Sequence, residues 1–173
     1  MNITPDKTAQ KKLHQATAPL RVDHALIAAL FFDYESSKSN KKKKEIAVKI
    51  CTELSVHAQV EEEIFYPAFK RAMRDKLLVS GASVEHATLK ELIAQVEGQE
   101  PDGEMFDAKI KVLSEYLKYQ VKEEQNEMFP KAKARKIDLE EMGVKITQRN
   151  ETLMSKHAES ESLETSNAFG SST

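Results

Sequence analysis

The sequence is poor in the residues that end secondary structure. Glycine and proline together account for 10 of its 173 residues, five of each, which is about half their share in average proteins. A β-sandwich or β-barrel needs a turn about every 8–12 residues, and this chain lacks the residues for those turns. The composition therefore predicts a helical protein, and the length favours a single domain.

Further absences exclude other classes of protein. The longest apolar run, 25–32, has eight residues, far fewer than the roughly 20 needed to cross a bilayer. Residues 1–15 lack the apolar stretch of a secretory signal. The single cysteine, Cys51, cannot form an internal disulfide, so the fold does not depend on an oxidising compartment. We therefore expect a cytoplasmic protein with no membrane partner.

The charge balance does not favour nucleic-acid binding. Lysine and arginine number 26 against 28 aspartates and glutamates, a net charge of −2, which offers no broad attraction to a phosphate backbone. The basic cluster at 41–44 is interpreted as the solvated start of a helix. We therefore expect no nucleic-acid partner.

What the chain does have is long stretches of helical periodicity. The hydrophobic pattern predicts four helices, at about residues 19–36, 41–73, 77–96 and 104–129, the last ended by Pro130. Four long helices with short connections favour an all-α, antiparallel up-down four-helix bundle.

The ends of the chain differ in composition from this central part. A weaker amphipathic stretch at about 138–156 predicts a short extra C-terminal helix. The bundle domain then spans 18–156 and follows a polar N-terminal segment, 1–17. Residues 157–173 are rich in Ser, Thr and Glu, and we expect them to form a disordered tail.

Polar residues interrupt the apolar seam of each predicted helix near its middle. An ionised carboxylate buried without a partner is strongly destabilising, and no lysine or arginine lies on these seams. Either the carboxylates are protonated and hydrogen-bonded, or a multivalent cation holds them. Three imidazoles beside two carboxylates favour the cation, and such nitrogen and oxygen ligands suit iron, manganese or zinc better than calcium or magnesium. The interrupting residues are His24, His57, Glu61, His86, Gln120 and Glu124.

The second and fourth helices share an internal repeat. His57 and Glu61 lie one helical turn apart, so both side chains point toward one cluster. The same layout recurs 63 residues later. Two such arms facing each other would let their glutamates bridge a pair of metals. The seven matched pairs are Ile50/Leu113, Leu54/Leu117, His57/Gln120, Glu61/Glu124, Phe65/Met128, Tyr66/Phe129 and Pro67/Pro130.

These motifs, taken in order, resemble the hemerythrin-like (HHE cation-binding) family. The resemblance covers about residues 18–156 and implies a non-haem di-iron centre inside a four-helix bundle, with two carboxylates and an oxo or hydroxo group bridging the irons. By this resemblance His24 and His57 would bind one iron, His86 the other, and Glu61 and Glu124 would bridge. The motifs that carry it are Val22-Asp23-His24, the run from His57 through Glu61 to Pro67, Glu85-His86, and the run from Val121 through Glu124 to Pro130.

One position departs from the family pattern. Gln120 stands where the family has a histidine, and an amide oxygen is a weaker ligand than imidazole. We therefore expect an asymmetric site, with the metal at His24 and His57 bound more tightly and Gln120 as a weak ligand or a residue lining the site. Tyr119 or a water could compensate at the weaker position, although nothing in the sequence shows this.

The family resemblance implies a protein that binds or reacts with O2, peroxide or nitric oxide in a protective or sensing role, for example under oxidative stress. The alternative is a non-catalytic iron buffer or a metal-dependent sensor module. The sequence leaves open whether the protein is an enzyme, which small molecule it binds, whether it holds one metal or two, and its redox partner, protein partner and oligomeric state.

Overall fold

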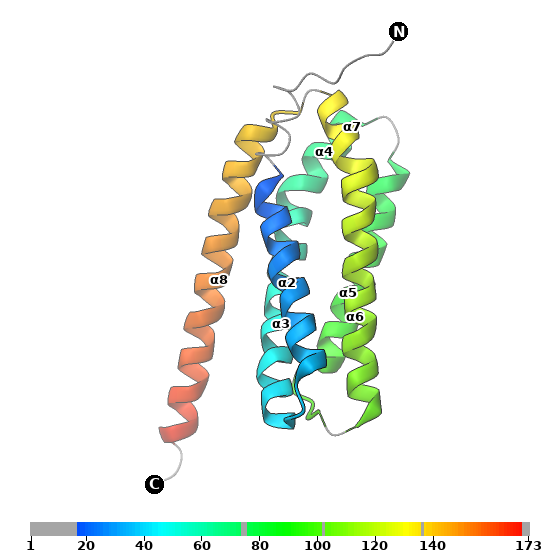
Figure 1. Ribbon diagram of the computed structural model, residues 1–173. Coiled ribbons are helices and arrows are strands. Elements are labelled where there is room, and N and C mark those ends of the chain that lie inside the picture. Colours follow the sequence, from blue (N-terminus) through cyan, green and yellow to red (C-terminus); the bar gives the residue numbers. More distant parts are fainter. Residues whose placement is uncertain (1–16, 74–75, 102, 136, 171–173) are drawn as a thin grey trace.

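The computed structural model describes residues 17–73, 76–101, 103–135 and 137–170, and all regular structure in these ranges is helical, with no strand (Figure 1). The prediction of an all-α protein is confirmed. The elements, in chain order, are α2 (Ala18–Ser36), α3 (Asn40–Val60), η1 (Glu61–Phe65), α4 (Tyr66–Ala72), α5 (Leu77–Val96), α6 (Glu104–Glu123), η2 (Glu124–Met128), α7 (Phe129–Ala134) and α8 (Leu139–Gly170), where η marks a π-helix.

The helix ends coincide with residues that favour them. Pro19 lies in the first turn of α2, where its missing N–H leaves no helical hydrogen bond unmade. Ser39 caps α3, and its hydroxyl oxygen accepts a hydrogen bond from the backbone N–H of Lys42. Gly98 follows α5 with a φ of +75°, a conformation that favours glycine. The predicted first and third helices are confirmed almost to the residue.

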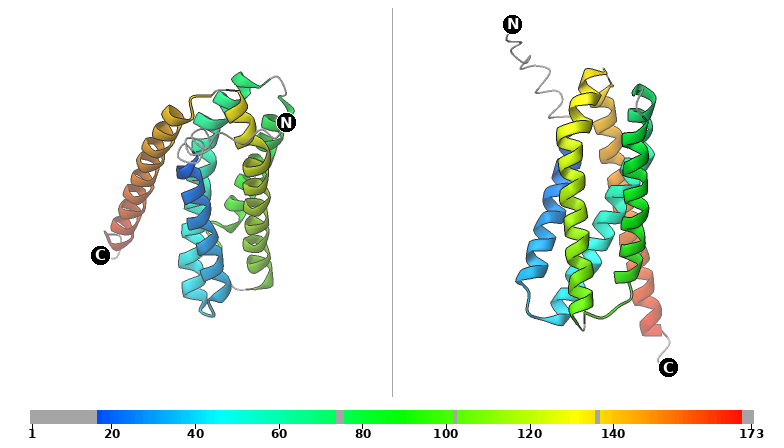
Figure 2. Two further views of the ribbon diagram at one scale, coloured as in Figure 1. Left: turned by 45° about the horizontal axis from the view of Figure 1, so that its top comes forward. Right: turned by 90° about the vertical axis from the view of Figure 1, so that its right-hand side faces the viewer.

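Four helical arms lie side by side in a closed ring. They are α2, then α3 with η1 and α4, then α5, and finally α6 with η2 and α7. Helix α2 packs against α3 and α6, and α5 packs against the same two elements from the other side. Consecutive arms run in opposite directions in Figures 1 and 2. This arrangement is consistent with an antiparallel up-down four-helix bundle. Helix α8 lies outside the ring, where it contacts α2, α3 and η1.

The apolar core is divided into two clusters along the bundle axis. One cluster contains Leu20 of α2 together with Phe65 and Phe69 from η1 and α4. The other contains Ile27 of α2 and Leu54 of α3. Every helical arm contributes apolar residues to both clusters. Each arm also has a buried polar side chain near the boundary between them: His24, His57, His86 and Gln120. The fold therefore brings the interrupted seams to one level inside the bundle.

Helix α8 is much longer than predicted. Its 32 residues run from Leu139 to Gly170, so it is longer than the short helix that the sequence predicted and extends into the segment from residue 157 where we expect a disordered tail. Met142, Ile146 and Leu153 are buried against the bundle and anchor the helix. Once a helix is anchored, each further residue adds a hydrogen bond without a new nucleation step, and 157–169 contain neither proline nor glycine to end it.

Parts of the predicted domain division lie outside the described residues. These are 1–16 of the polar N-terminal segment and 171–173 of the tail. The domain boundaries as such stay predictions. Among the described helices, none combines the length and the apolar character required to cross a membrane.

Candidate metal centre

A layer of polar side chains crosses the interior between the two apolar clusters. Every helical arm contributes to it, and none of its six side chains is more than 8% exposed. The structure therefore brings together all the residues that the sequence predicted for the site, while their roles as ligands stay predictions. They are His24 from α2, His57 from α3, Glu61 from η1, His86 from α5, Gln120 from α6 and Glu124 from η2.

The two glutamates occupy equivalent positions at the start of π-helical turns. Glu61 begins η1 and Glu124 begins η2, and in each turn the carbonyl of the glutamate accepts a hydrogen bond from the backbone N–H five residues later. Proline follows at 67 and 130. Because proline has no N–H and its ring clashes with the carbonyl four residues back, a widened turn before it is a reasonable adaptation. Such π-turns occur frequently at functional sites.

These turns correct one sequence prediction. Pro130 does not end the fourth helix, because the chain continues through it as α7 to Ala134. The proline lies in the first turn of α7, which is the helical position that tolerates it. The internal repeat is therefore present in the backbone as well as in the sequence.

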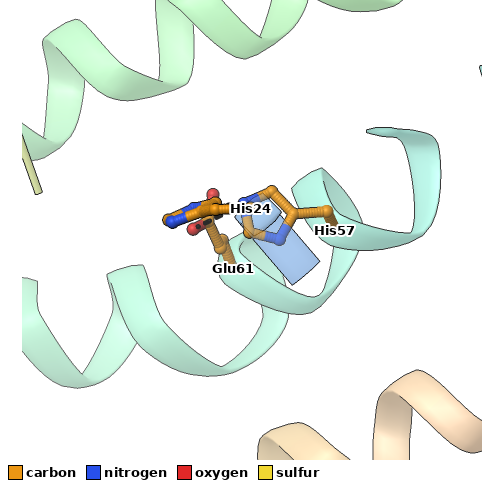
Figure 3. Close-up of side chains that lie close together, drawn as sticks. All are labelled: His24, His57 and Glu61. Atoms are coloured by element: carbon orange, nitrogen blue, oxygen red, sulfur yellow. Dashed lines mark hydrogen bonds and ion pairs between the residues drawn. The ribbon is translucent and has the colours of Figure 1, made fainter. Parts of the chain in front are cut away.

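One half of the layer, here called the His57 half, contains His24 and His57. Their Nε2 atoms lie 3.1 Å apart. His57 Nε2 is 3.2 Å from Glu61 Oε1, and His24 Nε2 is 3.3 Å from Glu124 Oε2. Ligand atoms of His24, His57 and Glu61 all lie within 4.8 Å of one another, and Figure 3 shows these three side chains converging. This spacing is suitable for a single metal ion.

The other half, here called the His86 half, contains His86 and Gln120. The amide nitrogen of Gln120 donates to Glu61 Oε2 at 2.6 Å and lies 2.9 Å from His86 Nε2. The Tyr66 hydroxyl donates to Glu61 Oε2 at 3.3 Å and lies 3.1 Å from His86 Nε2. A hydrogen-bonded network therefore fills this half.

Outer carboxylates orient two of the histidines. Asp23 Oδ2 lies 3.5 Å from His57 Nδ1 and accepts a hydrogen bond from the side chain of Asn150 on α8 at 2.9 Å. Glu62 Oε1 lies 3.2 Å from His86 Nδ1. A carboxylate behind a histidine directs the opposite ring nitrogen toward a metal and makes it more basic. Both histidines therefore present Nε2 to the interior of the layer.

The charged groups of the layer shift one another's pKa values. Burial favours the neutral form of Glu61, but His57 outweighs it and holds the pKa of Glu61 well below its usual range. Glu61 and Asp23 likewise overcome burial and raise the pKa of His57 well above 6.5. Burial and the charge on Glu61 raise the pKa of Glu124 well above its usual range, while burial and His57 lower the pKa of His24 to about 3. A cation bound in the layer would favour the deprotonated forms of His57 and Glu124.

Sequence reasoning missed one residue of the layer and misplaced another. Tyr66 belongs to the repeat, yet its hydroxyl could not be assigned to the site because π-turns change which side of a helix a residue faces. Tyr119, proposed to complete the weaker position, is 54% exposed and lies away from the buried layer. Tyr66 is the tyrosine at the site.

The layer fits a cation by the chemistry of its donor atoms. Glu61 Oε1 and Glu124 Oε2 are buried, and neither makes a hydrogen bond of normal geometry with the described residues. The same holds for His24 Nδ1. Buried carboxylate oxygens are normally satisfied, and a cation bound beside the two imidazole nitrogens would satisfy both of these. Mixed nitrogen and oxygen ligands favour a transition metal over calcium or magnesium.

Comparison with known proteins adds independent support. The family described as hemerythrin HHE cation binding domain matches residues 15–132. A protein named DNA nickase, from Nostoc sp., is 26% identical over 110 residues, which cover 64% of this chain and 31% of the nickase. The chain thus spans about a third of the length of that relative. No solved structure has significant similarity to the chain.

Proposed function

The chain belongs to the hemerythrin HHE cation-binding domain family, and on that basis we propose that its buried polar layer is a non-haem iron centre. The iron centre binds or reacts with O2, peroxide or nitric oxide in a protective or sensing role. We also infer that the ring of four arms is the antiparallel four-helix bundle of this family, with α8 as an extra C-terminal helix.

The observation that carries the proposal is the pair of carboxylates, Glu61 and Glu124, buried together with three imidazoles. Iron would supply redox chemistry and open coordination positions when bound. The protein's own part is to hold the ligand nitrogens and oxygens in place and to exclude water. The apolar clusters on both sides of the layer limit solvent access.

The proposal also covers the small-molecule ligand, the partners and the cellular location. We propose a small diatomic molecule or peroxide as the ligand, with no nucleic acid or membrane as partner and with the cytoplasm as the location. The net charge of −2 and the single cysteine support this. Whether the iron turns over as an enzyme depends on the reaction tests below.

The direct test is metal analysis followed by reaction with small oxidants. The protein is purified from iron-supplemented cells and its iron, manganese and zinc are quantified. The reduced protein is then exposed separately to O2, hydrogen peroxide and nitric oxide, and its optical spectrum is recorded. We expect iron to be the main metal and at least one of the three molecules to change the spectrum. Folded protein that takes up no iron would contradict the proposal.

A second candidate function is a non-catalytic iron buffer or a metal-dependent sensor. The observation that favours it is the polar link between α8 and the site, in which Asn150 donates to Asp23 behind His57. Next to it, Arg149 forms a two-pronged ion pair with Glu63 of η1. Loss of metal could then be transmitted to α8. Hydrogen exchange of α8 amides with and without metal tests this, and equal exchange rates in both states would refute it.

A further inference from the structure

We propose that the polar layer holds one cation, bound by His24, His57, Glu61 and Glu124, and that Gln120 and Tyr66 occupy with hydrogen-bond donors the place of a second cation. This inference rests on the proposed function, since it specifies how many metal ions the same layer binds. It also separates the chain from the two-iron centre that the family resemblance implied.

Each glutamate divides its two oxygens between the two halves of the layer. Glu61 Oε2 accepts the 2.6 Å hydrogen bond from Gln120, and Glu124 Oε1 accepts a weaker one at 3.4 Å from the same amide. The remaining oxygens, Glu61 Oε1 and Glu124 Oε2, point to the His57 half and make no normal hydrogen bond with the described residues. They lie 3.2 and 3.3 Å from the Nε2 atoms of His57 and His24, respectively, so a cation bound there would contact two oxygens and two nitrogens.

The Gln120 amide nitrogen occupies the place that a second cation would need. It lies within 3.4 Å of both glutamates and of His86 Nε2, which is where a second cation would have to sit to contact the same three ligands. Amide orientation is assigned from its neighbours, and two carboxylate oxygens require the NH2 group rather than the carbonyl oxygen to face them. A neutral donor therefore stands in for a positive charge.

The two halves also differ in their number of imidazoles. In the described part of the chain, ligand atoms of His24, His57 and Glu61 lie within 4.8 Å of one another, and Glu124 Oε2 lies 3.3 Å from His24 Nε2, whereas the other half has His86 as its single imidazole. The repeat explains the difference, because Gln120 occupies in the second arm the position that His57 holds in the first. In addition, the Tyr66 hydroxyl lies 3.1 Å from His86 Nε2, within hydrogen-bonding distance of the nitrogen that a second cation would need.

The number of cations bears on the chemistry. A single iron that cycles between the ferrous and ferric states exchanges one electron, whereas reduction of O2 to the peroxide level, or of peroxide to water, takes two. A one-iron centre without a second redox group therefore favours binding of nitric oxide, or metal sensing, over the two-electron reactions.

The test is iron stoichiometry under conditions where loading is not limiting. Metal-free protein is incubated anaerobically with excess ferrous iron, desalted, and analysed for iron per chain. We expect one iron in the wild type, two in Gln120→His, which restores a second imidazole, and one in Gln120→Leu, which removes the amide without adding a ligand. After oxidation, electron paramagnetic resonance should show an isolated high-spin ferric ion in the wild type and a weakened signal in Gln120→His, where two ferric ions couple.

A second pair of variants locates the metal and does not depend on the folding of Gln120→His. We expect His57→Ala to lose the iron and His86→Ala to keep it, with circular dichroism confirming that both are helical. Two irons in the wild type, or loss of iron in His86→Ala with retention in His57→Ala, would overturn this inference and leave the proposed iron centre standing. No iron in the folded wild type would instead refute the proposed function.

Discussion

The two arms that carry the glutamates are alike in backbone and differ in the residue that lies one helical turn before the glutamate. The first arm consists of α3, η1 and α4, and the second of α6, η2 and α7. Each contains a π-turn that begins at a glutamate, followed by a short helix with proline in its first turn. The first arm places His57 one turn before its glutamate, whereas the second places Gln120 there.

This comparison separates what shapes the site from what determines its chemistry. In both arms the regular helix before the π-turn carries the glutamate on its buried seam, and the π-turn changes the facing of the residues that follow. The residue one turn before the glutamate then decides whether its half of the layer offers a ligand or a hydrogen-bond donor. On our proposal, the exchange of this imidazole for an amide, with the Tyr66 hydroxyl beside it, makes a repeated scaffold bind metal asymmetrically.

The sharpest test of this comparison replaces the two matched residues in turn. His57→Ala removes a ligand nitrogen, and we expect its metal affinity to fall by more than the roughly 10–100-fold that loss of an outer-shell partner causes. Gln120→Ala removes only a donor from the His86 half, and we expect it to bind one metal ion with affinity within about 10-fold of wild type. Competition titration with a chromogenic chelator measures both. Equal losses of metal affinity in the two variants would contradict the assignment of the metal to the His57 half.

The next largest effect is the contribution of the cation to the stability of the folded chain. A cation between Glu61 and Glu124 should stabilise the folded chain by about 3 kcal/mol when free metal is at least 100-fold above its dissociation constant. For a chain of this size, removing it with a chelator should lower the melting temperature by roughly 6–12 °C. The matched control is His57→Ala, whose melting temperature the chelator should leave unchanged. A wild-type melting curve that ignores the chelator would count against a structural role for the cation.

A smaller effect should distinguish the outer carboxylates of the two halves. Asp23→Asn weakens the group behind His57, and we expect it to reduce metal affinity by roughly 10–100-fold. Glu62→Gln makes the equivalent change behind His86, and we expect little change because no metal depends on that histidine. The same chelator titration compares them. If Glu62→Gln has the larger effect, the metal lies in the other half.

Much of the fold could be predicted because it depends on patterns that the chain repeats many times. The apolar spacing of α2 and α5 gave their bounds closely, since both are regular helices with ordinary caps. The candidate site could be predicted for a related reason. Polar residues such as Glu61 on an otherwise apolar seam stand out against their neighbours, and the match between His57–Glu61 and Gln120–Glu124 pointed to one shared cluster.

What the sequence could not predict depends on local backbone geometry and long-range contacts. A π-turn changes the facing of every residue after it, so Tyr66 could not be assigned to the layer and Pro130 looked like a helix end. The contribution of Asn150 depends on where α8 docks, more than a hundred residues from Asp23 in sequence. The helix beyond residue 157 was missed because its composition is also typical of disordered segments.

The smallest expected effect tests the ion pair between Glu63 of the first arm and Arg149 of α8. Hydrogen bonds from Arg149 and Gln59 lower the pKa of Glu63 from 4.5 to about 2, whereas the matching position in the second arm is Asn126. Because the folded-state pKa is depressed, the stabilisation is present above about pH 4.5 and is lost as the pH falls toward 2.

We therefore expect Glu63→Gln to lower the urea midpoint slightly at pH 7 and to match the wild type near pH 2, because an exposed ion pair contributes little. Asn126→Ala is the control, with no pH-dependent difference from the wild type. A difference for Glu63→Gln that persists unchanged at pH 2 would assign its effect to packing rather than to charge.

The central claim is that one cation sits in the His57 half of the layer. Anomalous diffraction at the iron absorption edge, from crystals of the full chain grown with ferrous iron, tests it most directly. We expect a single peak in contact with His24, His57, Glu61 and Glu124, with the Gln120 amide still hydrogen-bonded to Glu61. A peak beside His86, a second peak of equal height, or no peak with Glu61 and Glu124 turned toward solvent would contradict the claim.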